Sequence, residues 1–199
     1  MLKRLILTLT VVLGIYFTLA NRPIEHAPGI LVAEQPSQTI EELATPFKHK
    51  TFHITPLANF SIKARVLSTE RYRLGKEAVL SPIDLALGWG TMSDTATLDQ
   101  LSISQGSRFY FWSAEQLSMP AAIITQHSAN MHMVPADAYI KSRLLDLRIG
   151  DIVSIDGYLI RAESADGWHW QSSLTRNDSG NGACELVWVK DLTILTSTT

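Results

Sequence analysis

The chain has 199 residues, a formal net charge of −2 at pH 7 and a hydrophobic content of 46%. A nearly neutral chain without a basic stripe cannot neutralise many phosphates, so this charge balance predicts no nucleic-acid partner. The single cysteine, Cys184, excludes a disulfide within the chain, so the core alone or a partner must hold the domain together.

The first twenty residues predict a membrane segment. Lys3 and Arg4 precede an almost unbroken apolar run from Leu5 to Ala20, and such positive residues stay on the cytoplasmic side of a bilayer. We expect residues 1–20 to be an uncleaved anchor or a cleaved signal segment. The length of the apolar run leaves both open, because it is shorter than the ~20 residues that usually span a bilayer and close to that of a long signal peptide. A buried globular helix is the remaining alternative.

Residues 21–58 predict a proline-rich tether. Five prolines recur in this segment without a sustained hydrophobic period, at positions 23, 28, 36, 46 and 56. Proline-rich chains are extended and fairly stiff, so we expect this segment to lift a domain away from the membrane. The alternative is that part of it packs as an edge strand.

Residues 59–199 predict one globular, strand-rich domain. Alternating or aromatic-rich runs are typical of strands, and they occur at 60–66, 108–112, 122–125, 151–160, 168–174 and 185–195. The clearest helix begins at Pro135 and ends at Gly150, with Ile140, Leu144 and Leu147 on one face. Segments 82–87 and 96–101 are candidates for short helices, the first because proline suits the first turn and the second because Ser93 or Asp94 can cap it.

This order of elements predicts a mostly β fold with one or two short helices. A helix between the third and fourth strands of a small, bent sheet indicates a five-stranded Greek-key barrel that is OB-fold-like. An SH3-like or other small barrel is the alternative.

Segment 127–133 is rich in coordinating and acid–base groups, with His127, Asn130 and His132 close together. In a straight strand the two histidines point to opposite faces, whereas a bend at residues 129–130 lets them converge. The segment can hold a buried loop by hydrogen bonds, supply a histidine base oriented by Asn130, or bind a metal together with a distant carboxylate. A five-residue histidine spacing matches no strong zinc motif, so no metal ligand and no cofactor is assigned.

Cys184 follows a glycine-containing loop and enters an apolar strand. A cysteine becomes a nucleophile when an imidazole takes its proton, and His132 or His127 is the candidate base, with Asn130 as the orienting group. The alternative is that Cys184 is a small core residue.

Trp89 and Arg176 complete the predicted contact surface. Trp89 lies between two glycines, which favours a surface loop, and Arg176 belongs to a polar run that can close the mouth of a barrel. We therefore expect His127, Asn130 and His132 to form a ligand-binding surface with Trp89 and Arg176. The five tryptophans can equally line a groove or fill the core.

Three phrases carry a resemblance to a protein family: residues 87–94, residues 127–135 and residues 182–185. They resemble an uncharacterised group of proteobacterial membrane-anchored proteins, and that resemblance implies no known activity. It implies a bacterial envelope setting. In that setting, Lys3 and Arg4 on the cytoplasmic side predict a single pass through the inner membrane, with the C-terminal domain on the periplasmic side.

These observations favour a membrane-anchored binding or assembly module that contacts another envelope protein or a small polar ligand. One alternative is a cysteine-dependent hydrolase or transferase acting on envelope material. Another is a metal-binding module. Because a fold alone establishes no activity, the choice depends on where the candidate side chains lie.

Overall fold

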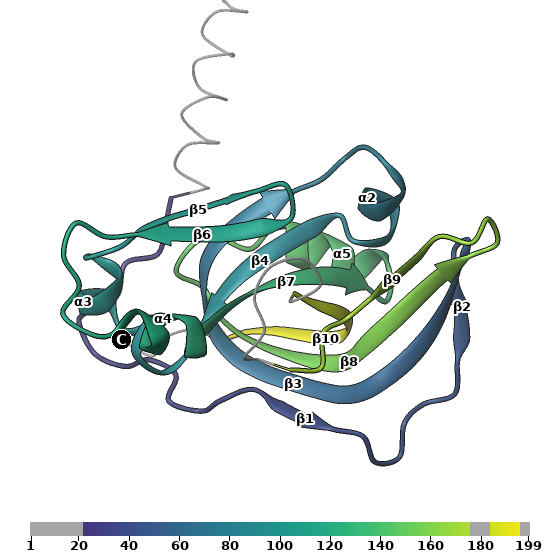
Figure 1. Ribbon diagram of the computed structural model, residues 1–199, viewed down its shortest axis with the longest axis horizontal. Coiled ribbons are helices and arrows are strands. Elements are labelled where there is room, and N and C mark those ends of the chain that lie inside the picture. The colour runs from purple at the N-terminus through teal and green to yellow at the C-terminus, as the bar shows by residue number, and fades with distance from the viewer. Residues whose placement is uncertain (1–21, 176–183, 196–199) are drawn as a thin grey trace, which may run out of the picture.

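A computed structural model describes residues 22–175 and 184–195 of the chain. Strands dominate the described part (Figure 1), which confirms the prediction of a mostly β fold. No helix within these residues is long and apolar enough to cross a bilayer. The membrane segment predicted at residues 1–20 lies outside the described residues.

Within the described ranges, five strands pair around a closed ring. They are β3 (Phe52–Arg71), β4 (Ile83–Gly88), β7 (Ser128–Pro135), β10 (Glu185–Leu195) and β8 (Ile152–Ser164). Each pairs with the next, and a long pairing between β3 and β8 closes the ring. The β7–β10 pair is parallel, whereas the other pairs of the ring are antiparallel.

Shorter strands and helices lie around this ring (Figure 1). Strands β1 (Ser37–Thr39) and β2 (Phe47–His49) pair with β3, and β9 (His169–Gln171) pairs with β8. A separate hairpin consists of β5 (Ser102–Gly106) and β6 (Phe109–Ser113). The helical elements are α2 (Lys76–Leu80), η1 (Gly90–Ser93), α3 (Thr95–Leu98), α4 (Ala121–Gln126) and α5 (Ala138–Leu145). These exceed the one or two short helices that we predicted.

The main core fills the inside of the ring. Alternate side chains of β4, namely Ile83, Leu85 and Leu87, belong to this core and are fully buried. The intervening Asp84 must therefore point to the outer face, because successive side chains of a strand alternate. This alternation corrects our prediction of a helix at 82–87: pairing with β3 and β7 outweighs the helix-start signal of Pro82.

The structure also decides two further predictions of secondary structure, at residues 122–125 and after Pro135. The strand predicted at 122–125 is wrong, because this segment is α4, whose Ile124 is fully buried in a second apolar cluster with Met92. The helix predicted after Pro135 is confirmed as α5, but it spans Ala138–Leu145 and ends before the predicted stop at Gly150. Its N-cap Asp137 accepts a hydrogen bond from the backbone N–H of Ile140, at 2.8 Å.

Part of the segment predicted as a tether is paired with the ring. Strand β3 begins at Phe52, seven residues before the predicted domain boundary at residue 59, and β1 and β2 both lie on it. Val32 is 3% exposed within the main core. Nearer the N-terminus, the N–H of Ile24 donates to the carbonyl of Ile149 at 2.8 Å. Residues 22–51 therefore run along the domain.

Candidate functional site

A hairpin loop places Arg108 on the outer face of the ring. Ser107 and Arg108 form the two-residue turn between β5 and β6, and both have positive φ, at 52° and 70°. Two successive residues of positive φ are typical of the type I′ turn, whose twist matches that of a hairpin. This turn directs the Arg108 guanidinium toward β4.

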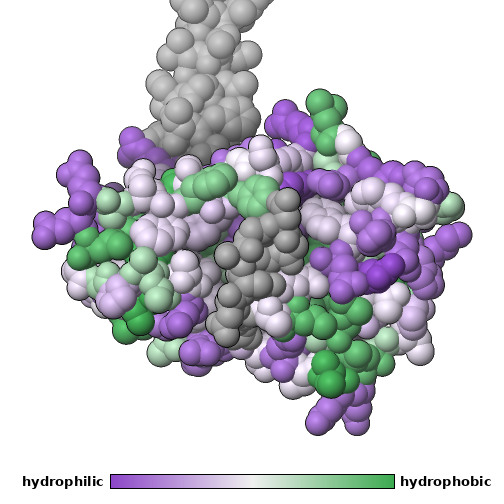
Figure 2. All heavy atoms as spheres, in the orientation of Figure 1, coloured by the Kyte–Doolittle hydropathy of each residue, from purple (hydrophilic) through white to green (hydrophobic). Residues whose placement is uncertain are grey.

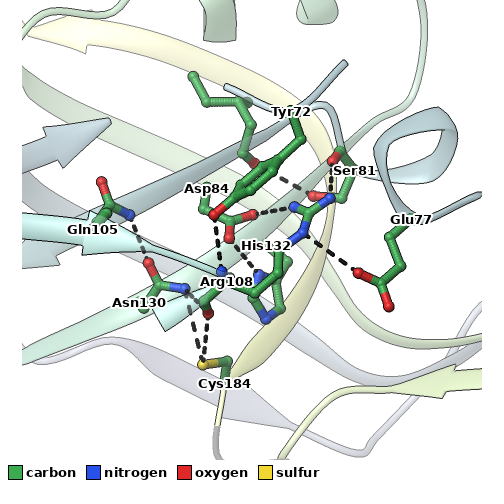
Figure 3. A network of polar contacts seen from close by, with 10 residues as sticks. Tyr72, Glu77, Ser81, Asp84, Gln105, Arg108, Asn130, His132 and Cys184 are labelled. Carbon is green, nitrogen blue, oxygen red and sulfur yellow. Dashed lines mark hydrogen bonds and ion pairs between the residues drawn. The ribbon is translucent and has the colours of Figure 1, made fainter. Parts of the chain in front are cut away.

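The guanidinium reaches a fully buried carboxylate. Arg108 Nη1 lies 2.6 Å from Asp84 Oδ1, and the Asp84 side chain has 0% exposure. Its other oxygen, Oδ2, lies 3.0 Å from His132 Nδ1, and Asp84 and His132 are register partners on β4 and β7. Figure 3 shows the carboxylate between the two basic groups. A buried charge needs such partners.

Further contacts hold the guanidinium in place. Arg108 Nη2 donates to the carbonyl of Ser81 at 3.0 Å, and Nε lies 3.6 Å from Glu77 Oε2. The guanidinium carbon lies 3.6 Å from the centre of the Tyr72 ring and 5.3 Å from that of Trp170. Burial is the main cause that raises the pKa of the Tyr72 hydroxyl, and this hydroxyl accepts a hydrogen bond from the Arg108 N–H at 2.9 Å.

Asn130 and Cys184 meet the backbone of the same arginine. Asn130 Nδ2 donates to the carbonyl of Arg108 at 3.0 Å, and Gln105 Nε2 donates to Asn130 Oδ1 at 2.6 Å. Cys184 Sγ lies 3.9 Å from both Asn130 Nδ2 and the Arg108 carbonyl. Three predicted site residues, Asn130, His132 and Cys184, therefore surround Arg108 (Figure 3). We call this set, with Asp84, the Arg108 network.

The other predicted contact residues lie elsewhere. His127 is the C-cap of α4, and its Nδ1 lies 2.7 Å from Thr91 Oγ1. Trp89, which we expected in a surface loop, is 2% exposed and belongs to the main core. Its backbone N–H donates to the carbonyl of His127 at 2.9 Å, so these two residues are neighbours. Arg176 lies outside the described residues.

An open pocket lies at one end of the ring. Its volume is about 450 Å³, and it lies between the end of β3, the β3–β4 loop and α5. Its cationic side chains in the described part of the chain are Lys50, Arg71, Arg73 and Lys141. None of the four lies within 4.0 Å of a carboxylate oxygen in residues 22–175 and 184–195. We call this cavity the cationic pocket.

Two of the lysines in the cationic pocket, Lys50 and Lys141, repel each other. Burial lowers the pKa of Lys50, and the nearby charge of Lys141 lowers it further. Lys50 Nζ donates to the carbonyl of Val79 at 2.7 Å, and the Arg71 guanidinium donates to the carbonyl of Leu145. Neutral carbonyls thus orient two of the cations without neutralising either charge.

No family model, no curated protein and no solved structure matches the chain. The described residues also contain no group of three or more His, Cys, Asp or Glu side chains that could hold a metal ion. The Arg108 network and the cationic pocket are therefore the features of the described residues that bear on function.

Sequence reasoning missed Arg108 and the whole cationic pocket. Arg108 was interpreted only as the start of a strand, and its contact with Asp84 depends on how the hairpin folds over the ring. One usable signal existed for the pocket: Arg71 and Arg73 are two residues apart at the end of a strand, a spacing that places side chains on one face. Lys50 lay in the predicted tether and Lys141 on the polar face of a helix.

Proposed function

We propose that this chain is a binding module of the bacterial envelope and that it takes an anionic ligand in the cationic pocket. In this proposal residues 1–20 anchor the chain in the inner membrane, and the described domain faces the periplasm. The observation that carries the proposal is the set of four cations that line an open cavity with no carboxylate oxygen of the described residues within 4.0 Å of them.

An anion relieves the repulsion among these cations. Like charges at short range destabilise one another, and the charge of Lys141 lowers the pKa of Lys50 in this way. A phosphate, sulfate or carboxylate group in the pocket reverses the sign of this interaction. Arg71 and Arg73 suit such a ligand because a guanidinium can bind two oxygens at once, whereas Lys50 and Lys141 act as point charges.

We also propose that the ring is of the OB type. Around the ring the strands follow the order β3, β4, β7, β10, β8 and back to β3. Numbered along the chain, this is the order first, second, third, fifth, fourth. The third and fifth strands, β7 and β10, are parallel, and α5 joins the third strand to the fourth, β8. In OB folds the loop between the first two strands contributes to ligand binding. Here that loop is residues 72–82, which supply Tyr72, Arg73, Ala78, Val79 and Pro82 to the cationic pocket.

The Arg108 network supports binding over catalysis. Asn130 and His132 are 6% and 4% exposed, and their polar atoms contact Arg108, Gln105 and Asp84. These contacts brace the β5–β6 hairpin against the ring. Tyr72 joins the two regions, since it stacks on Arg108 and also lines the cationic pocket.

Calorimetric titration with tripolyphosphate tests the proposal on the full chain in a neutral detergent. The wild type should bind, and Lys141→Gln should bind at least about tenfold more weakly, because a charge-assisted contact contributes about 1.5–3 kcal/mol. The matched control is Lys48→Gln, an exposed lysine on β2 outside the pocket, which should bind as the wild type does. Absence of binding, or equal weakening by both changes, would contradict the proposal.

A further inference from the structure

We infer that the anion in the cationic pocket is the phosphate of an anionic membrane lipid headgroup, so that the domain docks on the bilayer surface by this face. The inference rests on the proposed function, because it names the source of the same anionic ligand. Three features of the structure support it: exposed apolar side chains beside the pocket, the place where the chain enters the domain, and the charge of the pocket.

Exposed apolar side chains occur on the segments that form the pocket. Leu74 follows Arg73 directly and is 91% exposed, and Val79, which lines the pocket, is 52% exposed. Ile149, in the loop after α5, is 43% exposed. Figure 2 shows hydrophobic atoms that project beside hydrophilic ones at the corner where α2 lies in Figure 1. Single exposed apolar residues are ordinary, but apolar residues beside a cluster of cations are typical of surfaces that bind anionic membranes.

The start of the described chain lies close to the same face. The N–H of Ile24 donates to the carbonyl of Ile149 at 2.8 Å, and His26 Nε2 lies 2.7 Å from the carbonyl oxygen of Gly150. Leu145, which lines the pocket, is four residues before Ile149, so their Cα atoms are at most about 14 Å apart. With residues 1–20 as the anchor, the chain leaves the bilayer only a few residues before Ile24. The pocket is thereby held near the lipid headgroups.

The chemistry of the pocket suits a headgroup phosphate. A lipid phosphodiester presents two non-bridging oxygens that share one negative charge, and a guanidinium fork can bind both. Anionic lipids additionally attract basic residues at the bilayer surface through the negative surface potential. Leu74 follows Arg73 directly and is 91% exposed, so a headgroup phosphate bound by Arg71 and Arg73 would bring this leucine to the bilayer surface.

Hydrogen–deuterium exchange of the full chain in lipid nanodiscs tests this inference. Three conditions are compared: phosphatidylcholine alone, phosphatidylcholine with phosphatidylglycerol, and phosphatidylcholine alone with added inorganic phosphate. The readout is exchange in residues 72–82, with residues 95–101 around α3 as the internal reference. Phosphatidylglycerol should slow exchange in residues 72–82 about tenfold when the lipid is present at about ten times its Kd.

Variants and controls separate the possible results. The double change Lys50→Gln with Lys141→Gln should remove the protection, Lys48→Gln should retain it, and unchanged exchange of β8 shows that each variant is folded. Protection by inorganic phosphate without any further effect of phosphatidylglycerol overturns the lipid inference but leaves the proposed function standing. Equal exchange in all three conditions overturns the lipid inference, and the tripolyphosphate titration then decides the proposed function separately.

Discussion

Loss of the Asp84 charge should destabilise the domain strongly, because it leaves the Arg108 guanidinium without its nearest counter-ion. Asp84 is fully buried and the Arg108 side chain is 14% exposed, with 2.6 Å between their charged atoms. Removal of one partner from a buried pair costs about 3–5 kcal/mol. We expect the lower end for Asp84→Asn, because Arg108 keeps the carbonyl of Ser81 and the more distant Glu77.

Urea unfolding and thermal unfolding of the full chain in detergent, both followed by tryptophan fluorescence, measure this effect. A loss of about 3 kcal/mol corresponds to a fall in Tm of about 6–12 °C for a domain of this size. The matched control is Glu34→Gln, since Glu34 lies 3.9 Å from Lys63 in a pair whose side chains are 67% and 52% exposed. This control should change the free energy of unfolding by less than about 0.5 kcal/mol.

A second variant tests the reason for the loss. In Asp84→Asn with Arg108→Met the unpaired charge is absent, so the double variant should be no less stable than Asp84→Asn alone. A loss below about 1 kcal/mol for Asp84→Asn, or additive losses in the double variant, would refute the reasoning that this pair is buried and coupled.

The other predictions concern the cationic pocket, a tight strand crossing and the cysteine. The pKa of Lys50 lies below 10.5 in the folded chain. The free energy of unfolding should therefore rise with pH between this folded pKa and 10.5, because the unfolded chain holds more protons there. Lys141→Gln should reduce this rise and stabilise the protein at neutral pH, as measured by unfolding at each pH. Gly157→Ala should lower Tm or prevent folding, because a Cβ there collides with the carbonyl of Trp188; unchanged thermal unfolding would contradict this. Cys184→Ser should leave Tm and tripolyphosphate affinity nearly unchanged, and loss of binding in a folded variant would show that the thiol has a functional role.

The fold was predictable where the hydrophobic period was unambiguous. The alternating β3 segment and the α5 stripe of Ile140 and Leu144 have one period each, and local sequence decides them. At β4, Pro82 signals a helix start while Ile83 and Leu85 alternate as in a strand. Pairing with two neighbouring strands settles such a conflict, and no local signal contains that information.

The site was predictable only in part, because its contacts are long-range. Asn130, His132 and Cys184 were grouped from their chemistry only as candidates for a cysteine-dependent reaction, and the structure places all three around one centre. That centre is Arg108, whose partner Asp84 is 24 residues away in sequence. The cationic pocket is harder still to predict from the sequence, since Lys50 and Lys141 approach each other only after β2 and α5 have packed at the same end of the ring.

The most direct test of the cationic pocket is the pKa of Lys50 itself, measured by NMR on the full chain labelled with ¹³C-lysine. Without ligand, this pKa should lie below its ordinary value, because of burial and of Lys141. Added tripolyphosphate should raise it, since an anion in the pocket favours the charged ammonium. A pKa at the ordinary value that does not respond to the anion would contradict a ligand site built from uncompensated cations.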